Sequence, residues 1–575
     1  MTPSRLPAVL VVLVLGVAAA DWVTAIRGTV SVAATAALSA LVLPWALIVL
    51  RGALRTVAFH FVNLIFVVAF SAAKWLVLLD ALKLGAAPYV GSYRSYTAAL
   101  VVLLLVGIAL RGGRIAQLVA ASAERPARLM AASFGLTAVV GALLLALPTS
   151  LHDVGEVSLL DSLFMSTSAV CVTGLTTVNV ANTYTFSGQI VLCILMQLGG
   201  LGIMVLTAAV TMLAGRRLGV KSSAVLAEMV DASSLADLKR TISMIVSYTL
   251  VFEAIGAALL YLQLRAYPAD SFLYYADGGL GGSDSALWAA VFHSVSAFCN
   301  GSLSNFRDGM GPFANSPAFC QTISVLIVLG GLGFPVIHEL LFRWVDRLRG
   351  HRPLRLTLNT RVALTTTAGL LVSVAVLTFA LESGASFKDF GVGARINAAV
   401  FHSACSRTSG FNLVDVGTMR PATLLLTCFA IFVGAGSGST AGGIKVTTMA
   451  VLFAAFRGEL RGQRARLFDR SIPDAVVRRA MGVAFLSTVL VVVVVFLVLL
   501  SDNHEPLSVL FETVSAFSTT GMSTGITPRL SAIGKLLIIL TMLIGRIGPL
   551  TAALAFSAND HRPAHTLPQE RLMIG

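Results

Sequence analysis

The stretch FHSVSAFCNGSLSNF, residues 292–306, is the most informative part of this sequence. It starts like a helix and then breaks up into small polar residues around Gly301. The chain around it is very apolar: of its 575 residues, 57% are hydrophobic and 12% are charged, whereas soluble proteins have roughly 25% charged residues. Apolar runs of about 20 residues recur, and each can cross a hydrocarbon core. The sequence therefore predicts an all-α polytopic membrane protein.

Related segments occur four times between residues 128 and 557. They read LFMSTSAVCVTGLTT (163–177), VFHSVSAFCNGSLSN (291–305), VFHSACSRTSGFNLV (400–414) and LFETVSAFSTTGMST (510–524). Each continues from a Phe through small or hydroxyl residues to a glycine nine or ten residues later. Each also lies between two predicted spans, which indicates four M1–P–M2 repeats (membrane helix, pore segment, membrane helix) in a pseudo-fourfold arrangement. Four ordinary extracellular loops are the alternative, and the alignment disfavours it.

The physical properties of these segments are those of an ion pathway. Non-helical backbone at membrane depth persists only where it lines a watery cavity or is buried in protein. A short inward helix followed by an extended loop can aim carbonyl oxygens at an ion and replace its hydration shell. Glycine keeps side chains out of the ion's path. The expected selectivity filter, where the cation binds, consists of Val172, Thr173, Gly174, Leu175, Asn300, Gly301, Ser302, Thr408, Ser409, Gly410, Phe411, Thr519, Thr520, Gly521 and Met522.

The apolar runs predict up to twelve spans. Four precede the repeats, at about 6–26, 30–50, 56–80 and 96–110, and the first is also compatible with a cleaved signal peptide. Eight belong to the repeats, at about 128–149, 187–214, 241–264, 316–345, 361–382, 422–456, 476–500 and 533–557. The expected domains are an N-terminal transmembrane extension (1–125) and four pore repeats (126–220, 221–350, 351–470 and 471–575), the last with a short cytoplasmic tail.

The net charge of +14 indicates membrane topology rather than nucleic-acid binding. The segments 215–240, 343–361 and 457–479 are rich in Lys and Arg, whereas the alternate loops carry acids such as Asp153 and Asp502. The positive-inside rule puts the basic segments in the cytoplasm. We therefore expect a multi-pass protein of the cell inner membrane with both termini cytoplasmic. Contact of the basic segments with anionic membrane lipid is a secondary expectation.

The second spans of the repeats are related too. LGGLGIM (198–204), LGGLGFP (329–335) and IGRIGPL (544–550) align, so that Arg546 replaces a glycine. In the third repeat GAGSGSTAGGIK (434–445) interrupts the span, because so many glycines and serines cannot hold a straight helix. A broken helix or a charge at membrane depth indicates an ion path or gate. The expected gate residues are Gly436, Ser437, Gly438, Ser439, Thr440, Gly442, Gly443, Lys445 and Arg546, with a purely structural arginine as the alternative for Arg546.

An intramembrane enzyme or a non-conducting sensor is the competing class of function. An enzyme requires a nucleophile–base pair or metal ligands, and His293 and His402 are the best candidates. We expect both at the start of a pore helix, where a structural hydrogen bond is the simpler role. Glu253, a charge within a span, remains open between packing and function. The six cysteines have no metal or redox spacing and are expected to be small buried residues without a disulfide.

Together STSAVCVTGL, SAFCNGS, SRTSGFN, STTGMS, GSTAGGIK and GRIGPLT resemble the bacterial membrane subunit of the Trk/Ktr/HKT superfamily of potassium transporters, over about residues 128–557. The resemblance implies that the four loops supply carbonyls to K⁺, with Gly174, Gly410 and Gly521 as filter glycines. It also implies that 436–443 is an intramembrane gating loop and that Arg546 is the pore arginine below the filter. The expected function is potassium uptake down the electrochemical gradient, with no cofactor in this chain.

The resemblance implies partners as well, and the sequence departs from the family in two places. Family members form dimers and usually assemble with a cytosolic nucleotide-binding ring, so a homodimer and a separate regulatory subunit are expected. The N-terminal 125 residues exceed what the family core needs. In the second loop, Ser302 has the spacing of Gly174 and Gly521, whereas Gly301 has that of Gly410, and we favour Ser302 as the filter position. In plant relatives a serine at a filter glycine of the first loop accompanies sodium preference, so the alternative function is a sodium-permeable or weakly selective cation transporter.

Overall fold

The computed structural model describes residues 126–153, 157–202, 235–265, 283–307, 309–351, 355–549 and 551–552. The N-terminal extension (1–125) with its four predicted spans lies outside the described residues. So do the end of the predicted span 187–214, the basic stretch 215–234 and most of the C-terminal tail. The fold and the expected loops and gate can therefore be followed from residue 126 onward.

The described residues are mostly helical. In chain order the elements are α6 (Pro126–Leu145), α7 (Leu159–Val170), α8 (Val180–Thr183), α9 (Phe186–Leu201), α12 (Leu235–Leu264), α13 (Ser283–Phe298), η1 (Gly311–Phe313), α14 (Pro317–Leu332), α15 (Phe334–Leu348), α16 (Leu358–Glu382), α17 (Val392–Cys405), η2 (Val416–Thr418), α18 (Pro421–Phe432), α19 (Val446–Glu459), β1 (Arg466–Leu467), β2 (Arg470–Ser471), α20 (Asp474–Ser501), α21 (Pro506–Phe517), η3 (Thr527–Arg529) and α22 (Ala532–Ile547). The two short strands pair antiparallel in a hairpin between α19 and α20.

Four sets of helices follow one another, each with a first helix, a short pore helix, a loop and a second helix. The sets begin with α6, α12, α16 and α20, and their pore helices are α7, α13, α17 and α21. Consecutive sets touch through α9 and α13, α14 and α17, and α18 and α21, and the last set returns to the first through α22 and α7. A salt bridge of 2.7 Å between Lys535 Nζ and Asp161 Oδ1 fastens this return contact. The four sets therefore close into a ring.

The second helices end sooner than the apolar runs predict. α9, α14 and α22 stop at Gly202, Gly333 and Gly548, whose φ angles of 80°, 93° and 94° lie in the region that favours glycine. At Gly333 the chain turns by 104° into α15. The prediction of one continuous span over 316–345 was therefore wrong, and the predicted spans 187–214 and 533–557 do not continue as one helix past these glycines. Hydropathy did not predict these helix ends, because the residues after each glycine are still apolar.

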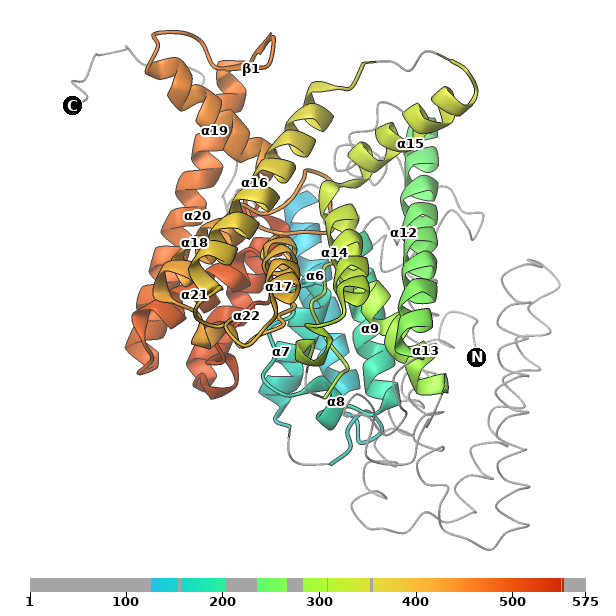
Figure 1. The fold of residues 1–575 in the computed structure, drawn as a ribbon. Coiled ribbons are helices and arrows are strands. Elements are labelled where there is room, and N and C mark those ends of the chain that lie inside the picture. Colours follow the sequence, from blue (N-terminus) through green and yellow to red (C-terminus); the bar gives the residue numbers. More distant parts are fainter. Residues whose placement is uncertain are drawn as a thin grey trace, which may run out of the picture.

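Three helices in the described part are long and apolar enough to cross a membrane, namely Ile242–Leu264, Leu358–Glu382 and Asp474–Ser501, and the bent pair α14–α15 adds a fourth if counted as one span. The second helices α9 and α18 and the pore helices α7, α13 and α21 contain shorter apolar segments of 10–17 residues. The end of α15 and the β1–β2 hairpin lie at one end of the described fold, while α8 lies at the other (Figure 1). Charge and fold therefore divide the described chain between the same two sides.

Glycines of the second helices let the pore helices approach closely. A Cβ at Gly199, Gly330 or Gly545 would collide with the carbonyl oxygen of Val170, Phe298 or Phe517, the last residue of the pore helix in the same set. These are the first glycines of the aligned LGGLG, LGGLG and IGRIG motifs. The motif therefore serves a backbone-to-backbone contact between pore helix and second helix.

We predict that Gly330→Ala destabilises the protein by at least about 2 kcal/mol, because the new methyl group meets backbone that cannot move aside. The matched control is Gly369→Ala in α16, where an added Cβ has nothing within 4 Å and the helix gains an alanine. Thermal unfolding in detergent measures both variants. Equal midpoints for Gly330→Ala and Gly369→Ala would contradict this packing role.

Candidate functional site: four convergent loops

The four expected filter segments meet at one place. We call them loop 1 (172–175), loop 2 (300–302), loop 3 (408–411) and loop 4 (519–522). The Ser302 hydroxyl donates a hydrogen bond to the Thr520 carbonyl (2.8 Å) and accepts one from the Gly410 N–H (2.5 Å). A Cβ at Gly174 would collide with the Cβ of Ser302. One residue of loop 2 therefore touches all three other loops.

The loops share an unusual backbone. In loops 1, 2 and 4 the residue eight positions after the Phe has positive φ, at Val172 (55°), Asn300 (60°) and Thr519 (49°). In loop 3, where the spacing is one residue shorter, Thr408 takes this place with φ 80°. A side chain in this conformation costs roughly 1–2 kcal/mol and persists only where the surroundings impose it. Four such residues in equivalent places indicate a functional constraint on the loops.

The backbone also distinguishes the two spacings in loop 2. Gly174 and Gly521 have φ angles of 92° and 88°, and Ser302 takes the same left-handed region with φ 59°. Gly301 is not among the residues with positive φ. Ser302 therefore lies where loops 1 and 4 have glycine, and its Cβ and hydroxyl project toward the point where the loops meet.

Serines of the pore helices hold the loops, and sequence reasoning missed them. The Ser168 hydroxyl accepts the Gly174 N–H (2.9 Å), and the Ser515 hydroxyl accepts the Gly521 N–H (3.1 Å). In the second set the Ser296 hydroxyl instead donates to the Leu303 carbonyl (2.8 Å). Each serine stands four residues after the aligned Phe, and this shared position is the signal that could have identified them.

Several hydroxyl groups of the loops have no protein partner. Those of Thr173, Thr408, Ser409, Thr519 and Thr520 are fully buried and make no hydrogen bond within the described residues. Buried hydroxyls ordinarily have a partner, so these oxygens are available to something that passes between the loops. Hydroxyl and carbonyl oxygens are the ligands that hard cations prefer.

The second helix of the third set is interrupted beneath the four loops. α18 ends at Phe432 and α19 starts at Val446, and we call residues 433–445 the intramembrane loop. Its backbone bonds to the second set, since Gly436 N–H donates to the Gly331 carbonyl (2.8 Å) and Gly438 O accepts from Phe334 N–H (3.0 Å). A Cβ at Gly442 would collide with the Thr519 hydroxyl of loop 4. The interruption predicted from the sequence is present, directly against loop 4.

Arg546 joins this loop to the first set. Its Nη1 donates to the Thr440 carbonyl, and its Nη2 donates to the Gly199 carbonyl. The Asn300 side chain of loop 2 donates to the Thr440 hydroxyl (3.0 Å), and Lys445 Nζ donates to the Ala441 carbonyl (2.6 Å). Thr440 is thus held by both a filter loop and the arginine. Arg546 thus has the carbonyl partners of a structural arginine, one of them Thr440 of the expected gate and the other Gly199 of α9.

The two histidines have structural hydrogen bonds, as expected, but not at the start of their helices. His293 and His402 lie in the second halves of α13 and α17. His293 Nδ1 is 2.8 Å from the Ala289 carbonyl and its Nε2 is 3.0 Å from the Ser304 hydroxyl, while His402 Nε2 is 3.0 Å from the Thr427 hydroxyl. The expected position was wrong because each helix begins well before the aligned Phe.

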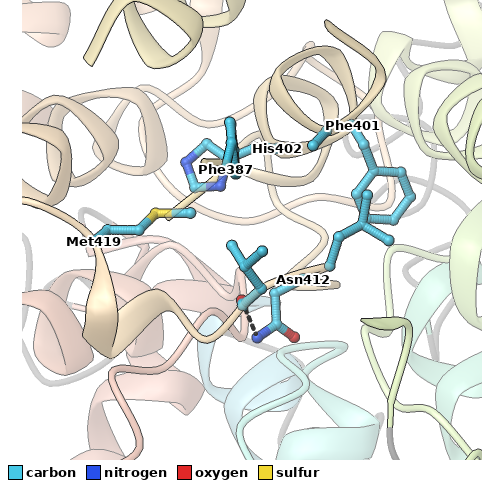
Figure 2. A pocket seen from close by; sticks show the side chains of 8 residues that line it. Phe387, Phe401, His402, Asn412 and Met419 are labelled. Atoms are coloured by element: carbon cyan, nitrogen blue, oxygen red, sulfur yellow. Dashed lines mark hydrogen bonds between the residues drawn. The ribbon is translucent and has the colours of Figure 1, made fainter. Parts of the chain in front are cut away.

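His402 also lines a cavity of about 10 Å³ behind loop 3. Figure 2 shows its ring near Phe387 and Met419, with Asn412 below them donating to the Val414 carbonyl (3.0 Å). Ligand pockets usually measure about 300–1,000 Å³, so this cavity has no room for an organic substrate. Among the residues that the structure describes, no group of three His, Cys, Asp or Glu side chains is placed to hold a metal ion.

Glu253 is buried at the middle of the span Ile242–Leu264, behind loop 2. Its carboxylate accepts from Gln197 Nε2 (3.2 Å) and from Cys299 Sγ (3.5 Å), and Cys299 directly precedes Asn300. All six cysteines lie in the described chain as free thiols, five of them buried and Cys193 half-buried. Glu253 therefore packs against the base of loop 2 without a cationic partner among the described residues.

Comparison with known proteins gives a consistent result. A model of the family TrkH, described as a cation transport protein, matches residues 104–564. The chain is 36% identical over 454 residues to the Ktr system potassium uptake protein B of Vibrio alginolyticus, covering 78% of this chain and 94% of that protein. It is 33% identical over 439 residues to the protein of the same name from Bacillus subtilis (strain 168), covering 76% and 94%.

Two further similarities are relevant. The potassium/sodium uptake protein NtpJ of Enterococcus hirae is 33% identical over 458 residues, covering 78% of this chain and 97% of that protein. The crystal structure of the potassium transporter TrkH from Vibrio parahaemolyticus matches with a TM-score of 0.58 at 18% identity, covering 75% of this chain and 84% of that one. At that identity the structural match supports the fold.

We predict that Arg546→Ala loosens the intramembrane loop. A hydrogen bond from a charged donor contributes about 1.5–3 kcal/mol, so amide hydrogen exchange at 436–443 should accelerate roughly 10- to 100-fold. The control is Arg529→Ala, because the exposed Arg529 donates only to the Gly525 carbonyl of its own loop. Unchanged exchange in a folded Arg546→Ala protein would show that the arginine does not hold this loop.

Proposed function

Because this chain belongs to the TrkH family of cation transport proteins, within the Trk/Ktr superfamily, and is a transporter rather than an enzyme, we propose that it carries potassium into the cell through a pore between its four loops. The observation that supports this most directly is the group of five buried, unpartnered hydroxyls where the loops meet. The names of the two Ktr relatives, potassium uptake proteins, support the choice of K⁺.

In this proposal the filter consists of loops 1 to 4. Their backbone carbonyls, assisted by hydroxyls such as Thr173 and Thr519, replace the water around K⁺. Pore-helix serines fix the loop backbone, so the oxygens do not need to reorganise when an ion arrives. The driving force is the membrane potential, which contributes about 2.3 kcal/mol per charge for each 100 mV. Transport then requires no nucleotide site in this chain.

The gate of the proposed pore is the intramembrane loop together with Arg546. The loop lies against Thr519 of loop 4, and Asn300 of loop 2 bonds to its Thr440. A cation about 6 Å from the guanidinium experiences a repulsion of about 3 kcal/mol at an effective dielectric constant near 20. Conduction therefore requires the loop and the arginine to move away from the axis together.

Ser302 supports a second candidate, a sodium-permeable or weakly selective cation transporter. Its hydroxyl lies among loops 2, 3 and 4, where it offers an extra ligand and narrows the space between them. The name of the relative NtpJ, a potassium/sodium uptake protein, agrees with such a range of cations. Potassium uptake remains our first choice because loops 1 and 4 retain glycine at this position.

We further propose that the protein works as a homodimer in the inner membrane, with its basic segments and both termini in the cytoplasm. The end of α15 and the hairpin after α19, which belong to the basic segments 343–361 and 457–479, lie at one end of the described fold, which fits the positive-inside rule. A separate cytosolic nucleotide-binding subunit would regulate it there. The printed names of the relatives, components of a Ktr system, fit a membrane subunit that has partners.

Growth of a bacterium deficient in K⁺ uptake tests the proposed function. Expression of this chain, alone and with a matching regulatory subunit, should restore growth at low K⁺. Purified protein in proteoliposomes should carry K⁺ inward when the interior is made negative. Absence of both effects, with the protein present in the membrane, would refute potassium uptake, and transport of Na⁺ at an equal rate would favour the second candidate.

We predict that Ser302→Gly raises the K⁺-over-Na⁺ flux ratio several-fold, because it removes the hydroxyl from the filter and relieves about 1–2 kcal/mol of backbone strain. Gly301→Ala should change the ratio less, because its Cβ would meet the flexible thioether of Met196. Competitive K⁺/Na⁺ flux in proteoliposomes measures both variants. A larger effect from Gly301→Ala would give the filter position to Gly301, contrary to this prediction.

A further inference from the structure

Arg407 is a buried charge that the proposed function does not yet use. It directly precedes Thr408 of loop 3, and its side chain is 5% exposed. Its Nη2 donates to the Gly434 carbonyl (3.3 Å), whereas Nε and Nη1 have no hydrogen-bond partner among the described residues. No acidic side chain forms an ion pair with it in the described part of the chain. A buried guanidinium held by one carbonyl is expensive, so its position requires a reason.

Comparison of the four sets supplies that reason. Arg407 stands six residues after the aligned Phe, where the other sets have Val170, Phe298 and Phe517. The carbonyls of these three residues pack on Gly199, Gly330 and Gly545, so the pore helix and the second helix are locked by close contact. In the third set α17 ends at Cys405 and meets α18 through the His402–Thr427 hydrogen bond, while Arg407, two residues after α17, donates to the Gly434 carbonyl of the intramembrane loop. The close glycine contact of the other sets is thus replaced at this position by a side-chain hydrogen bond that can break.

A small cavity gives the guanidinium a place to move. It measures about 10 Å³, room for about one water molecule, and is lined by Arg407, Thr367, Ala435, Gly331 and neighbouring apolar side chains. The buried Thr367 hydroxyl likewise has no hydrogen-bond partner in the described chain. Arg407 can therefore exchange the Gly434 carbonyl for a water or for Thr367 without leaving its site.

We propose that Arg407 is a positioning residue that couples loop 3 to the intramembrane loop, through its hydrogen bond to the Gly434 carbonyl. The donor of this bond, Arg407, directly precedes Thr408 of loop 3, and the acceptor, Gly434, lies at the start of the intramembrane loop. Movement of the intramembrane loop pulls on loop 3, and displacement of loop 3 loosens the intramembrane loop. This inference rests on the proposed function, because it assigns the coupling between its filter and its gate.

The test compares K⁺ flux and the K⁺/Na⁺ flux ratio in proteoliposomes. Arg407→Gln should raise K⁺ flux about tenfold, since the loss of a charge-assisted hydrogen bond releases the loop, and should lower the ratio several-fold. Arg407→Lys retains a charged donor and should lie close to the parent in both. Arg546→Ala, which releases the loop at Thr440 away from loop 3, should raise flux with the ratio unchanged.

Two further variants make the result specific. Arg395→Gln, in the preceding helix α17, is the matched control, because the partly exposed Arg395 donates to the carbonyls of Phe390 and Lys388 before that helix, and it should behave like the parent. In the double variant Arg407→Gln/Arg546→Ala the increases in flux should be less than multiplicative, since both changes free the same loop. The K⁺/Na⁺ flux ratio of this double variant should equal that of Arg407→Gln alone.

The outcomes separate this proposal from the proposed function. If the parent protein shows no K⁺ flux, the proposed function fails whatever Arg407 does. If the parent transports K⁺ and a folded Arg407→Gln protein changes flux without the ratio, or the ratio without flux, the coupling role is refuted. Multiplicative effects in the double variant would refute it as well. If Arg407→Gln does not fold, the double variant Arg407→Lys/Thr367→Val decides instead. Thr367 is the alternative partner of the side chain at position 407, so its loss should lower K⁺ flux only if that side chain leaves the Gly434 carbonyl.

Discussion

The hydrogen bond between a pore-helix serine and the backbone of the loop that follows is the interaction on which the rest of this structure depends. Inside a hydrocarbon layer no water is available to satisfy exposed N–H and C=O groups, so non-helical backbone survives only if the protein itself supplies partners. Ser168 and Ser515 supply them for the glycines of loops 1 and 4, and Ser296 does so for loop 2 through the Leu303 carbonyl. With the loops fixed in this way, their remaining oxygens can face one another instead of the helices around them.

The loops also require their helices to come very close, and small residues make this approach possible. In three sets a glycine of the second helix contacts the end of the pore helix, and the same helix then stops at a further glycine. The third set differs at both points, because its second helix is interrupted and Arg407, just after the pore helix, bonds to Gly434 by its side chain. The close glycine contacts are therefore distributed unequally around the ring, and the set without one carries the intramembrane loop.

Much of this architecture could be predicted from the sequence, because repetition reveals what a single segment cannot. The four aligned Phe-to-Gly segments located all four loops, and the glycine-rich stretch 434–445 located the interruption. Helix ends were not predictable from hydropathy, because the residues after Gly333 remain apolar while the chain turns by 104°. The two spacings in loop 2 could not be separated by counting residues, since the difference between Gly301 and Ser302 is one of backbone conformation. Arg407 was missed because its hydrogen-bond partner, the Gly434 carbonyl, is 27 positions away in the sequence.

Ser302 illustrates a consequence of building all four sets of the ring from one polypeptide. Its hydroxyl fits between the Thr520 carbonyl and the Gly410 N–H only because loops 3 and 4 have other residues there. In an assembly of four identical subunits, the same change would place four hydroxyls at one level of a narrow axis, where they would obstruct one another. Covalent linkage removes this restriction, since each quarter can accept a substitution that symmetry would multiply. Such a protein can adjust the chemistry of its axis one ligand at a time.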